Sequence, residues 1–352
     1  MVAPLDWGLG HATRCVPLIR ELLDLNYEVI IAAEKAPAAL LKAEFPTLTF
    51  LALKGYEITY SRSGGSMALV IALQLPKILR QIKYEQAWLK KIVAEHDIDI
   101  IISDNRPGLY HKNIPCFYIT HQLQIPAGNI FFRWLAKRMH YRYINKFSAC
   151  LVPDAAENTD LAGSLSHPQK MPLVPVHYMG PLSRFEIVPV QKKYDLLVLL
   201  SGPEPQRSIF EENLLCQLKN YSGSCLFVRG LPGQSTKILF ENSNVELTDH
   251  LPAAALNVAI LQAQMIIARS GYTTVMDLVK LKQKAILVAT PGQPEQEYLS
   301  KLLMQKKIFY TEEQSEFIIE KALEKAALFS YSPVSLDLDN YKKVLTDVLK
   351  HL

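Results

Sequence analysis

The sequence predicts an α/β protein built from two doubly wound parallel-sheet domains that face each other across a cleft. Short apolar runs alternate with helical patterns in both halves of the 352-residue chain, which is typical of strands joined by crossover helices. A proline-rich passage from Pro168 to Pro189 separates the halves and is typical of a linker. We therefore expect an N-terminal domain at residues 1–185, a C-terminal domain at 186–335, and a final helix at 336–352 that packs back across both.

Composition and cysteine spacing argue against several classes of protein. The longest apolar run at a helix start, Met67 to Leu75, is too short to span a bilayer, so we expect a cytoplasmic protein. The five cysteines are scattered and never occur in C-x-x-C spacing, which argues against a disulfide framework or a zinc site. Residues 1–185 carry 20 Lys and Arg against 15 Asp and Glu, and the remainder carries 18 against 19. This bias favours an anionic partner, although such a surplus is also ordinary for a protein surface.

The chain begins with a strand, a glycine-containing loop and a helix. Gly8 and Gly10 allow a tight turn between the first strand and the helix. A strand at residues 27–33 follows. The loop lacks the third glycine of the G-x-G-x-x-G dinucleotide fingerprint, and the acidic residue expected at the end of the second strand is matched only by Glu34. Both observations argue against NAD(P) binding. His11, at the junction of loop and helix, is the better candidate for chemistry, and its structural alternative is capping or packing of the helix start.

Two further strands of the N-terminal half end in polar side chains. The run at residues 98–102 is followed by Asp104, and the run at 116–119 is followed by His121. Because the carboxyl ends of parallel strands meet at one edge of a sheet, we expect both residues on the same edge as His11. They are candidates for the acceptor site, and a purely structural role for either one stays open.

Two helical segments accompany these strands. The first runs from Met67 to His96 after the polar loop Ser61 to Ser66, and we expect Pro76 to kink it or divide it in two. The second, at residues 130–147, has five Lys and Arg and no acid beside a stripe of apolar and aromatic residues. Such a helix can lie on an anionic membrane surface, or it can turn its stripe toward the core. No nucleic-acid-binding signature accompanies it, so we expect no nucleic-acid partner.

A βαβ unit at residues 264–300 carries the strongest binding signal in the chain. Its first apolar run ends in Arg269, Ser270 and Gly271, and a helix opens at Tyr272 with Thr273 and Thr274 in its first turn. A helix N-terminus presents unpaired N–H groups and a partial positive charge, and hydroxyls there add donors. This turn therefore suits a phosphate group.

Other loops at the same edge of the second sheet are candidates for the rest of a nucleotide. Asp277 lies one turn into the helix, where a carboxylate can accept hydrogen bonds from a ribose diol. The second strand of the unit ends in a polar loop from Pro291 to Glu297, and Gly202 follows the apolar run at residues 194–200. Leu251 follows the run at 245–248. We expect these loops to face one ligand.

These residues resemble the C-terminal domain of the glycosyltransferase family 28 type, the family that includes the N-acetylglucosaminyltransferase of lipid II synthesis. In that family an RSG-x-x-T-x-x-E stretch binds a nucleoside diphosphate and a Pro-rich loop ending in Gln-Gln grips the donor sugar. Asp replaces the ribose-binding Glu, and Glu replaces the second Gln. The family's G-x-G-H motif, at the acceptor side of the N-terminal domain, matches Gly8, Gly10 and His11. The donor-side matches are Arg269, Ser270, Gly271, Thr274, Asp277, Gln296 and Glu297, with Gly202 facing the pyrophosphate and Leu251 the base.

The resemblance implies the GT-B architecture and a glycosyltransferase that moves a hexosyl group, with N-acetylhexosaminyl as one form, from a UDP-sugar to a hydroxyl acceptor with inversion. A lipid-linked acceptor and peripheral contact with an anionic membrane are part of that expectation. His11 would be the base, with Asp104 and Asp6 as alternatives, since imidazole titrates near neutral pH. Arg269, Thr273 and Thr274 would stabilise the leaving diphosphate.

Two D-x-D sequences, at residues 97–99 and 337–339, match the motif with which another glycosyltransferase architecture binds a metal and a diphosphate. The first precedes a strand, at the edge opposite the predicted site, and the second begins the last helix. We therefore expect no metal and no cofactor. Two alternatives remain open. One is an epimerase of UDP-N-acetylhexosamine, which needs acidic residues at the sugar ring that the sequence does not assign. The other is a nucleotide-sugar-binding protein without catalysis.

Overall fold

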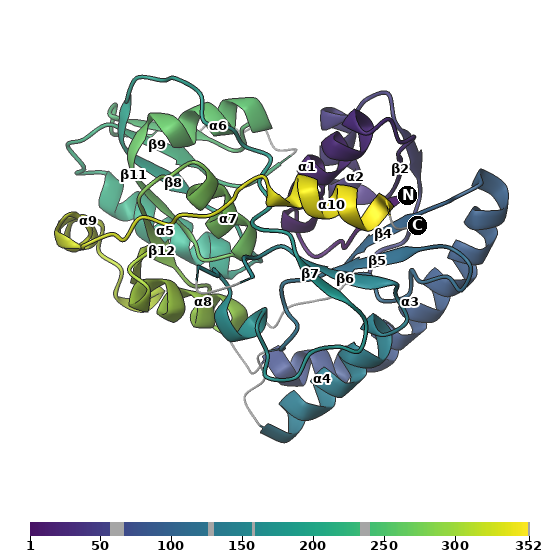
Figure 1. Ribbon diagram of the computed structural model, residues 1–352. Coiled ribbons are helices and arrows are strands. Elements are labelled where there is room, and N and C mark those ends of the chain that lie inside the picture. The colour runs from purple at the N-terminus through teal and green to yellow at the C-terminus, as the bar shows by residue number, and fades with distance from the viewer. Residues whose placement is uncertain (57–66, 126–129, 157–158, 233–239, 351–352) are drawn as a thin grey trace. The chain divides into compact units, whose positions relative to one another are not determined.

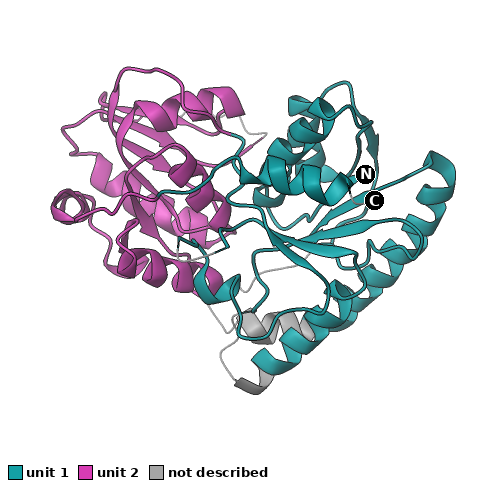
Figure 2. Ribbon diagram, viewed as in Figure 1, with its two compact units in different colours: residues 1–59, 66–184, 335–352 teal, residues 60–65, 185–334 magenta. Residues whose placement is uncertain are grey.

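The computed structural model describes residues 1–56, 67–125, 130–156, 159–232 and 240–350. The chain divides into two compact units: unit 1 is formed by residues 1–59, 66–184 and 335–352, and unit 2 by residues 60–65 and 185–334 (Figure 2). Each unit contains one parallel sheet with helices packed around it (Figure 1). The predicted α/β class with two doubly wound sheets is confirmed.

Unit 1 has a seven-stranded sheet in the order β3-β2-β1-β4-β5-β6-β7. The order reverses between β1 and β4, so the loops that follow these strands separate at a topological switch point, where open α/β sheets bind ligands. Pro4, which ends β1, pairs with Asp104, which ends β4. The strands are β1 Val2–Pro4, β2 Ile30–Ala32, β3 Thr49–Leu51, β4 Ile101–Asp104, β5 Cys116–Ile119, β6 Ala149–Val152 and β7 Val176–Tyr178.

The helices of unit 1 cover this sheet with their apolar faces. α1 buries Val16 and Ile19, among others, because its apolar residues recur at helical spacing. α3 continues through Pro76 as one 30-residue helix, so the helix is not divided there, and the alternative, a kink at Pro76, stays a prediction. The expected loop Ser61 to Ser66 lies outside the described residues. The helices are α1 Gly10–Asp24, α2 Lys35–Glu44, α3 Met67–His96, α4 Ile130–Ile144, the 3-10 turn Gly163–Leu165 and α10 Asn340–Lys350.

The proline-rich passage expected as a linker contains a strand of the first sheet. β7 pairs with β6 at the sheet edge, where the Cys150 N–H donates to the Pro175 carbonyl at 2.8 Å. An edge strand bonds on one side only, so prolines beside it cost few hydrogen bonds. The proline-rich composition therefore predicts a linker here, although β7 is a strand of the sheet.

The last helix, α10, packs within unit 1 (Figure 1, yellow). It buries Tyr341, Leu345 and Leu349, which recur every four residues along one face. The Asn340 side chain donates to the Tyr178 carbonyl at 3.0 Å and so joins the helix start to β7. Packing of this helix across both domains stays a prediction.

Unit 2 has a six-stranded parallel sheet in the order β10-β9-β8-β11-β12-β13, with its switch point between β8 and β11. Its strands are β8 Tyr194–Leu199, β9 Cys225–Val228, β10 Val245–Thr248, β11 Ala263–Arg269, β12 Ala285–Val288 and β13 Tyr310–Glu312. Its helices are α5 Gln206–Leu218, α6 Ala253–Gln262, α7 Tyr272–Lys280, α8 Pro294–Gln305, the 3-10 turn Gln314–Glu316 and α9 Ile319–Leu328.

The polar loop expected at Pro291 to Glu297 is shorter than predicted. α8 begins at Pro294, so Gln296 and Glu297 lie in its first turn. Proline is well suited to the first helical position because its fixed φ matches the helix and it lacks an N–H that would stay unpaired there. Acidic residues in the first turn add a favourable interaction with the helix dipole.

Candidate active site

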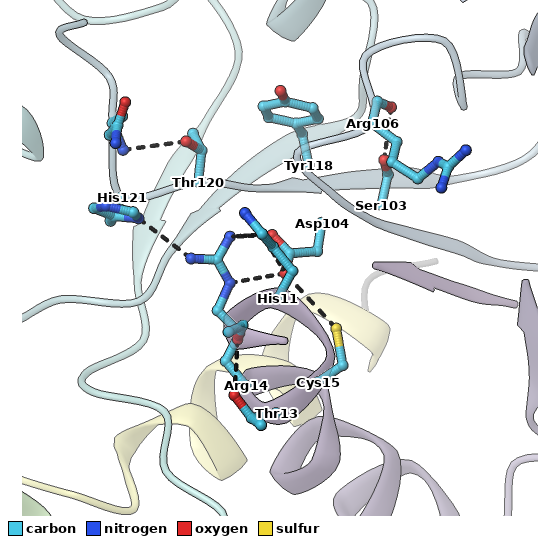
Figure 3. A network of polar contacts seen from close by, with 12 residues as sticks. His11, Thr13, Arg14, Cys15, Ser103, Asp104, Arg106, Tyr118, Thr120 and His121 are labelled. Carbon is cyan, nitrogen blue, oxygen red and sulfur yellow. Dashed lines mark hydrogen bonds and ion pairs between the residues drawn. The ribbon is translucent and has the colours of Figure 1, made fainter. Parts of the chain in front are cut away.

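Four polar side chains meet at the switch point of unit 1 (Figure 3). Arg14 Nε donates to Oδ2 of Asp104 at 2.7 Å, and an Nη atom of Arg14 donates to the other carboxylate oxygen. The two Nη atoms of Arg14 also lie 2.8 Å from His11 Nδ1 and 3.2 Å from His121 Nδ1. His11 Nδ1 in turn lies 3.2 Å from Asp104 Oδ2. We call these four residues the His11 cluster.

The His11 cluster is largely buried and holds an ion pair. The side chain of His11 is 14% exposed, whereas those of Arg14 and Asp104 are 2% and 0% exposed. Burial acts to raise the pKa of Asp104, but the charges of Arg14 and His11 and their hydrogen bonds outweigh it and lower this pKa to about 2. Burial lowers the pKa of His11, an effect that Asp104 opposes and Arg14 reinforces. Asp104 is therefore ionised and His11 neutral near pH 7.

The sequence predicted three members of this cluster and missed the fourth. His11, Asp104 and His121 come together at the carboxyl edge, as expected for residues at or after the ends of β1, β4 and β5. Arg14 was not singled out, although a signal was present. It lies three residues after His11 on a helix that buries most of its side chains, and a buried arginine requires a carboxylate partner.

A second buried ion pair supports the loops of the same edge. Arg106 Nε donates to Oε1 of Glu85 at 2.8 Å. The Tyr56 hydroxyl and the Gly108 N–H donate to the other oxygen of Glu85, at 2.8 and 2.9 Å. Burial still raises the pKa of Glu85, although Arg106 and these donors oppose the shift. This pair joins α3 to the loops that follow β3 and β4.

Asp6, the alternative base, supports the same loops. Its Oδ1 accepts the Tyr56 N–H at 2.9 Å. A Cβ atom on Gly55 would lie 2.1 Å from Asp6 Oδ2, so only glycine lets the chain pass this close. Asp6 thus fixes the loop after β3, and its role as a base stays a prediction.

The switch point of unit 2 carries the predicted phosphate site. α7 begins at Tyr272 with Gly271 as its N-cap, and a Cβ atom on Gly271 would meet no atom within 4 Å. The space beside the Gly271 Cα is therefore open at this helix N-terminus. Thr273, Thr274 and Asp277 are partly exposed on this helix. Their contacts with a nucleotide remain predictions.

Arg269 is buried behind this helix start. It is 1% exposed, and its two Nη atoms donate to the carbonyls of Ala289 at 3.2 Å and Gln206 at 2.9 Å. The guanidinium carbon lies 4.4 Å from the centroid of the Phe210 ring. Burial lowers the pKa of Arg269 to about 10, so it stays charged at pH 7. It joins the end of β11 and the residue after β12 to the start of α5.

The side chains expected to grip the donor sugar organise the turn before α8. Gln296 Oε1 accepts the Thr290 N–H at 2.9 Å, and Glu297 Oε1 accepts the Gly292 N–H at 2.9 Å. The buried Ser270 hydroxyl donates to the Gln296 carbonyl at 3.0 Å and connects this turn to the end of β11. Gln296 and Glu297 are still partly or fully exposed, so contact with a sugar stays a prediction.

Thr290 was missed by the sequence argument. Its side chain is 1% exposed, and within the described residues its Oγ1 has no hydrogen-bond partner. A Cβ atom on Gly202, the predicted pyrophosphate-facing residue, would lie 3.5 Å from this oxygen. Gly202 has φ +108°, a conformation that favours glycine. The loops after β8 and β12 therefore meet at these two residues.

An ionic network holds the loop that carries Leu251, the predicted base contact. Arg229 donates to Oδ1 of Asp249 at 2.6 Å and also bonds Glu211 on α5. Arg207 donates to the other oxygen of Glu211 at 2.7 Å. Leu251 itself is partly exposed. The network ties this loop to α5. Arg207 and Glu211 are an i,i+4 pair on that helix, whereas Arg229 lies 18 residues from Glu211 and 20 from Asp249, so its partners are not visible in a local pattern.

One group of side chains in the described residues has metal-ligand spacing. Asp154, Asp160 and His167 place ligand atoms within 4.8 Å of one another. Both oxygens of Asp154 already accept hydrogen bonds, from the N–H groups of residues 155, 161 and 162 and from the Ser166 hydroxyl. These bonds make Asp154 the centre of a folded loop, and we assign no metal to it.

Comparison with known proteins supports the enzyme class and the fold. Residues 230–344 match the model of the Glycosyltransferase family 28 C-terminal domain. The chain is a glycosyltransferase with the GT-B fold. The family match covers the βαβ unit at residues 264–300, where the sequence resemblance was strongest. No curated protein sequence matches the chain.

Solved structures of GT-B glycosyltransferases resemble this glycosyltransferase over its whole length. SnogD from Streptomyces nogalater has a TM-score of 0.65 and 15% identity, covering 100% of this chain and 98% of that one. UGT2 of Phytolacca americana, complexed with UDP-2fluoro-glucose and pterostilbene, has a TM-score of 0.60 and 12% identity, covering 99% and 92%. MurG of Acinetobacter baumannii has a TM-score of 0.56 and 12% identity, covering 100% and 99%. At these identities the likeness shows the fold, and the predicted GT-B architecture is confirmed.

Proposed function

We propose that this glycosyltransferase moves a hexosyl group from a UDP-sugar to a hydroxyl acceptor, with inversion at the anomeric carbon. The observation that carries the proposal is the His11 and Asp104 pair at the switch point of unit 1. A neutral imidazole beside a buried carboxylate is suited to general-base chemistry, because the carboxylate stabilises the imidazolium that forms. The proposal assigns the base to unit 1 and the donor to unit 2.

In the reaction, His11 Nε2 takes the proton of the acceptor hydroxyl as its oxygen attacks the anomeric carbon. The bond between that carbon and the diphosphate oxygen breaks, and its electron pair leaves with UDP. The lowered pKa of His11 supports this role, since the ring must be neutral to accept a proton. Direct displacement from the opposite face inverts the anomeric centre.

The donor site is proposed on α7 and the loops beside it. The N–H groups that follow Gly271, with the hydroxyls of Thr273 and Thr274, would hold the diphosphate and stabilise the charge it gains on leaving. Asp277 would accept hydrogen bonds from the ribose diol. The bound UDP-2fluoro-glucose of the UGT2 neighbour supports a uridine donor of this class.

The test measures UDP release from UDP-glucose, UDP-N-acetylglucosamine and UDP-galactose by the purified protein. Water serves as the acceptor when no other acceptor is supplied. UDP release that His11→Ala abolishes, with UDP affinity retained, supports the assignment. Interconversion of the sugar epimers without UDP release would instead support the epimerase alternative. Equal UDP release by wild type and His11→Ala would overturn the role of His11.

We also propose that the N-terminal part of α4, around Trp134 and Leu135, contacts an anionic membrane. This contact would bring the enzyme to an acceptor that is attached to a membrane lipid. Trp134 is 55% exposed and Leu135 37% exposed, and the Arg138 guanidinium lies 5.5 Å from the Trp134 ring centroid. Farther along the helix, Ile144 is fully buried. The helix is therefore buried near its end but presents exposed apolar side chains among basic residues at Trp134 and Leu135. Within the described residues, no helix is long and apolar enough to cross a membrane.

Cosedimentation with vesicles tests this contact. We expect binding to phosphatidylglycerol vesicles and little binding to phosphatidylcholine vesicles, because the basic side chains require anionic headgroups. The double substitution Trp134→Ser and Leu135→Ser should weaken binding, and Leu173→Ser, at an exposed residue outside α4, should not. Binding that the α4 substitutions leave unchanged would exclude this surface.

A further inference from the structure

The guanidinium of Arg14 contacts both histidines of the His11 cluster through the same kind of ring atom. Its Nη atoms lie 2.8 Å from His11 Nδ1 and 3.2 Å from His121 Nδ1. A guanidinium has five N–H donors and no acceptor, and it keeps its charge in proteins. Each histidine must therefore receive a hydrogen bond at Nδ1. In that state Nδ1 carries no proton, and the proton of the neutral ring is on Nε2.

This state conflicts with the action of His11 as a base. To take a proton at Nε2, the ring needs a lone pair there, so its own proton must be on Nδ1. The acceptor available for an Nδ1–H group is Asp104 Oδ2, 3.2 Å away. That oxygen already accepts the Nε–H of Arg14 at 2.7 Å. Arg14 and His11 thus compete for the same carboxylate, and the shorter distances belong to Arg14.

We propose that Arg14 is a positioning residue that holds His11 as the Nε2–H tautomer in the ligand-free protein, and that His11 becomes a base when its Nδ1–H donates to Asp104. The second half of this inference rests on the proposed function. Conversion takes one proton from solvent at Nδ1 and returns one from Nε2, so the net charge of the ring is unchanged. An acceptor hydroxyl that donates to Nε2 favours the converted tautomer, because it requires a lone pair there.

The charges around His11 set how strongly it holds a proton. The groups that face it are Asp104 at the end of β4, Arg14 on its own helix, and His121 after β5. The Asp104 carboxylate favours an imidazolium, whereas Arg14 and His121 disfavour it. Arg14 is the permanent charge of the two, and it also neutralises Asp104. Removal of Arg14 therefore leaves the Asp104 carboxylate without its main partner. His11 should then bind a proton more tightly, because its imidazolium is the remaining cation that can pair with Asp104.

The tautomer can be read directly by nitrogen-15 NMR of histidine-labelled, ligand-free protein. We expect the wild type to show His11 with an unprotonated Nδ1 and a protonated Nε2 near pH 7. In Arg14→Met, His11 should gain a proton at Nδ1 and its proton affinity should rise by about tenfold or more. A wild-type His11 protonated on Nδ1, or an unchanged tautomer in Arg14→Met, would overturn the inference.

A second variant covers the case in which Arg14→Met does not fold because Asp104 is left buried and unpaired. The double variant Arg14→Met with Asp104→Asn removes both charges and leaves a carbonyl oxygen that can accept from Nδ1. We expect His11 to populate the Nδ1–H tautomer there as well, and the wild-type tautomer in this variant would contradict the inference.

The pH dependence of UDP release connects the tautomer to the reaction. In Arg14→Met the acidic limb of the profile should move to higher pH, because His11 then stays protonated to higher pH. A changed tautomer with an unchanged profile would preserve the NMR inference and remove His11 from the role of base. The failure of the proposed function is thereby distinguished from the failure of the tautomer assignment.

Discussion

The Nδ1 atom of His11 lies 3.2 Å from Oδ2 of Asp104, although 93 residues separate them in the chain. The fold brings them together because β1 and β4 are neighbours at the switch point and a five-residue loop after β1 leads into α1. A pair of this kind, with an exposed edge on His11 and a fully buried carboxylate, can move a proton at the edge while its partner stays ionised.

Replacing His11 by alanine should lower the rate of UDP release by about 10²- to 10⁴-fold, the usual contribution of a positioned base. UDP affinity should stay within about twofold, since the donor site is assigned to unit 2. Rates of UDP release and calorimetric titration of the same preparations measure both quantities. The conservative variant His11→Gln fills the same space without a titrating group and should be as inactive.

Replacing Asp104 by asparagine should lower the free energy of unfolding by about 3–5 kcal/mol near neutral pH, because Arg14 then stays buried without a counter-charge. Urea unfolding of wild type and variant gives this difference. An equal stability of the two proteins would show that the buried charge of Arg14 is compensated elsewhere.

The same difference should depend on pH in one direction. The pKa of Asp104 is lowered to about 2 in the folded protein, against about 3.9 for an unfolded aspartate. A lowered folded pKa means that the stabilisation is fully present above about pH 4 and is lost as the pH falls toward 2. The stability gap between wild type and Asp104→Asn should therefore narrow over this range. A gap that widens on acidification would contradict the assigned ionisation.

Thr290→Val should leave the free energy of unfolding unchanged or raise it by about 1 kcal/mol, because the buried Oγ1 of Thr290 makes no hydrogen bond within the described residues. Thr290→Ser is the matched control: it keeps the hydroxyl and loses one buried methyl, which should cost about 0.8 kcal/mol. Thermal and urea unfolding compare the three proteins. Strong destabilisation by valine would mean that the hydroxyl has a partner in solution.

Glu297→Gln should leave stability within about 0.5 kcal/mol, since an amide oxygen can accept the Gly292 N–H as the carboxylate does. It should change the relative rates with UDP-glucose, UDP-N-acetylglucosamine and UDP-galactose, because an exposed carboxylate and an amide offer different hydrogen bonds to sugar hydroxyls. Identical preferences would place Glu297 outside the sugar site.

The sequence was informative where the chemistry is local. The start of α7 could be predicted because Gly271 and the threonines after it are adjacent in the chain and sit between two clear strand patterns. His11, Asp104 and His121 could be placed on one edge because each lies at or shortly after the carboxyl end of a strand of a parallel sheet.

What could not be predicted depends on contacts between distant segments. Arg14 bonds a carboxylate 90 residues away, and Arg269 bonds the carbonyl of Gln206, 63 residues before it, so neither partner is visible in a local pattern. Prolines on both sides of β7 mask its strand pattern. Pro294 is compatible both with a loop and with a first helical residue, so the start of α8 cannot be placed from the sequence.

The most direct test of the account is calorimetric titration of UDP into wild type, Asp277→Ala and the control Glu324→Ala, which removes an exposed carboxylate from α9 of the same unit. The account predicts one saturable UDP site in wild type, weakened about tenfold or more by Asp277→Ala because two ribose hydrogen bonds to a charged group are lost, and unaffected by Glu324→Ala. A folded wild type that binds no UDP, or an Asp277→Ala variant that binds it as tightly as wild type, would contradict the donor site assigned to α7.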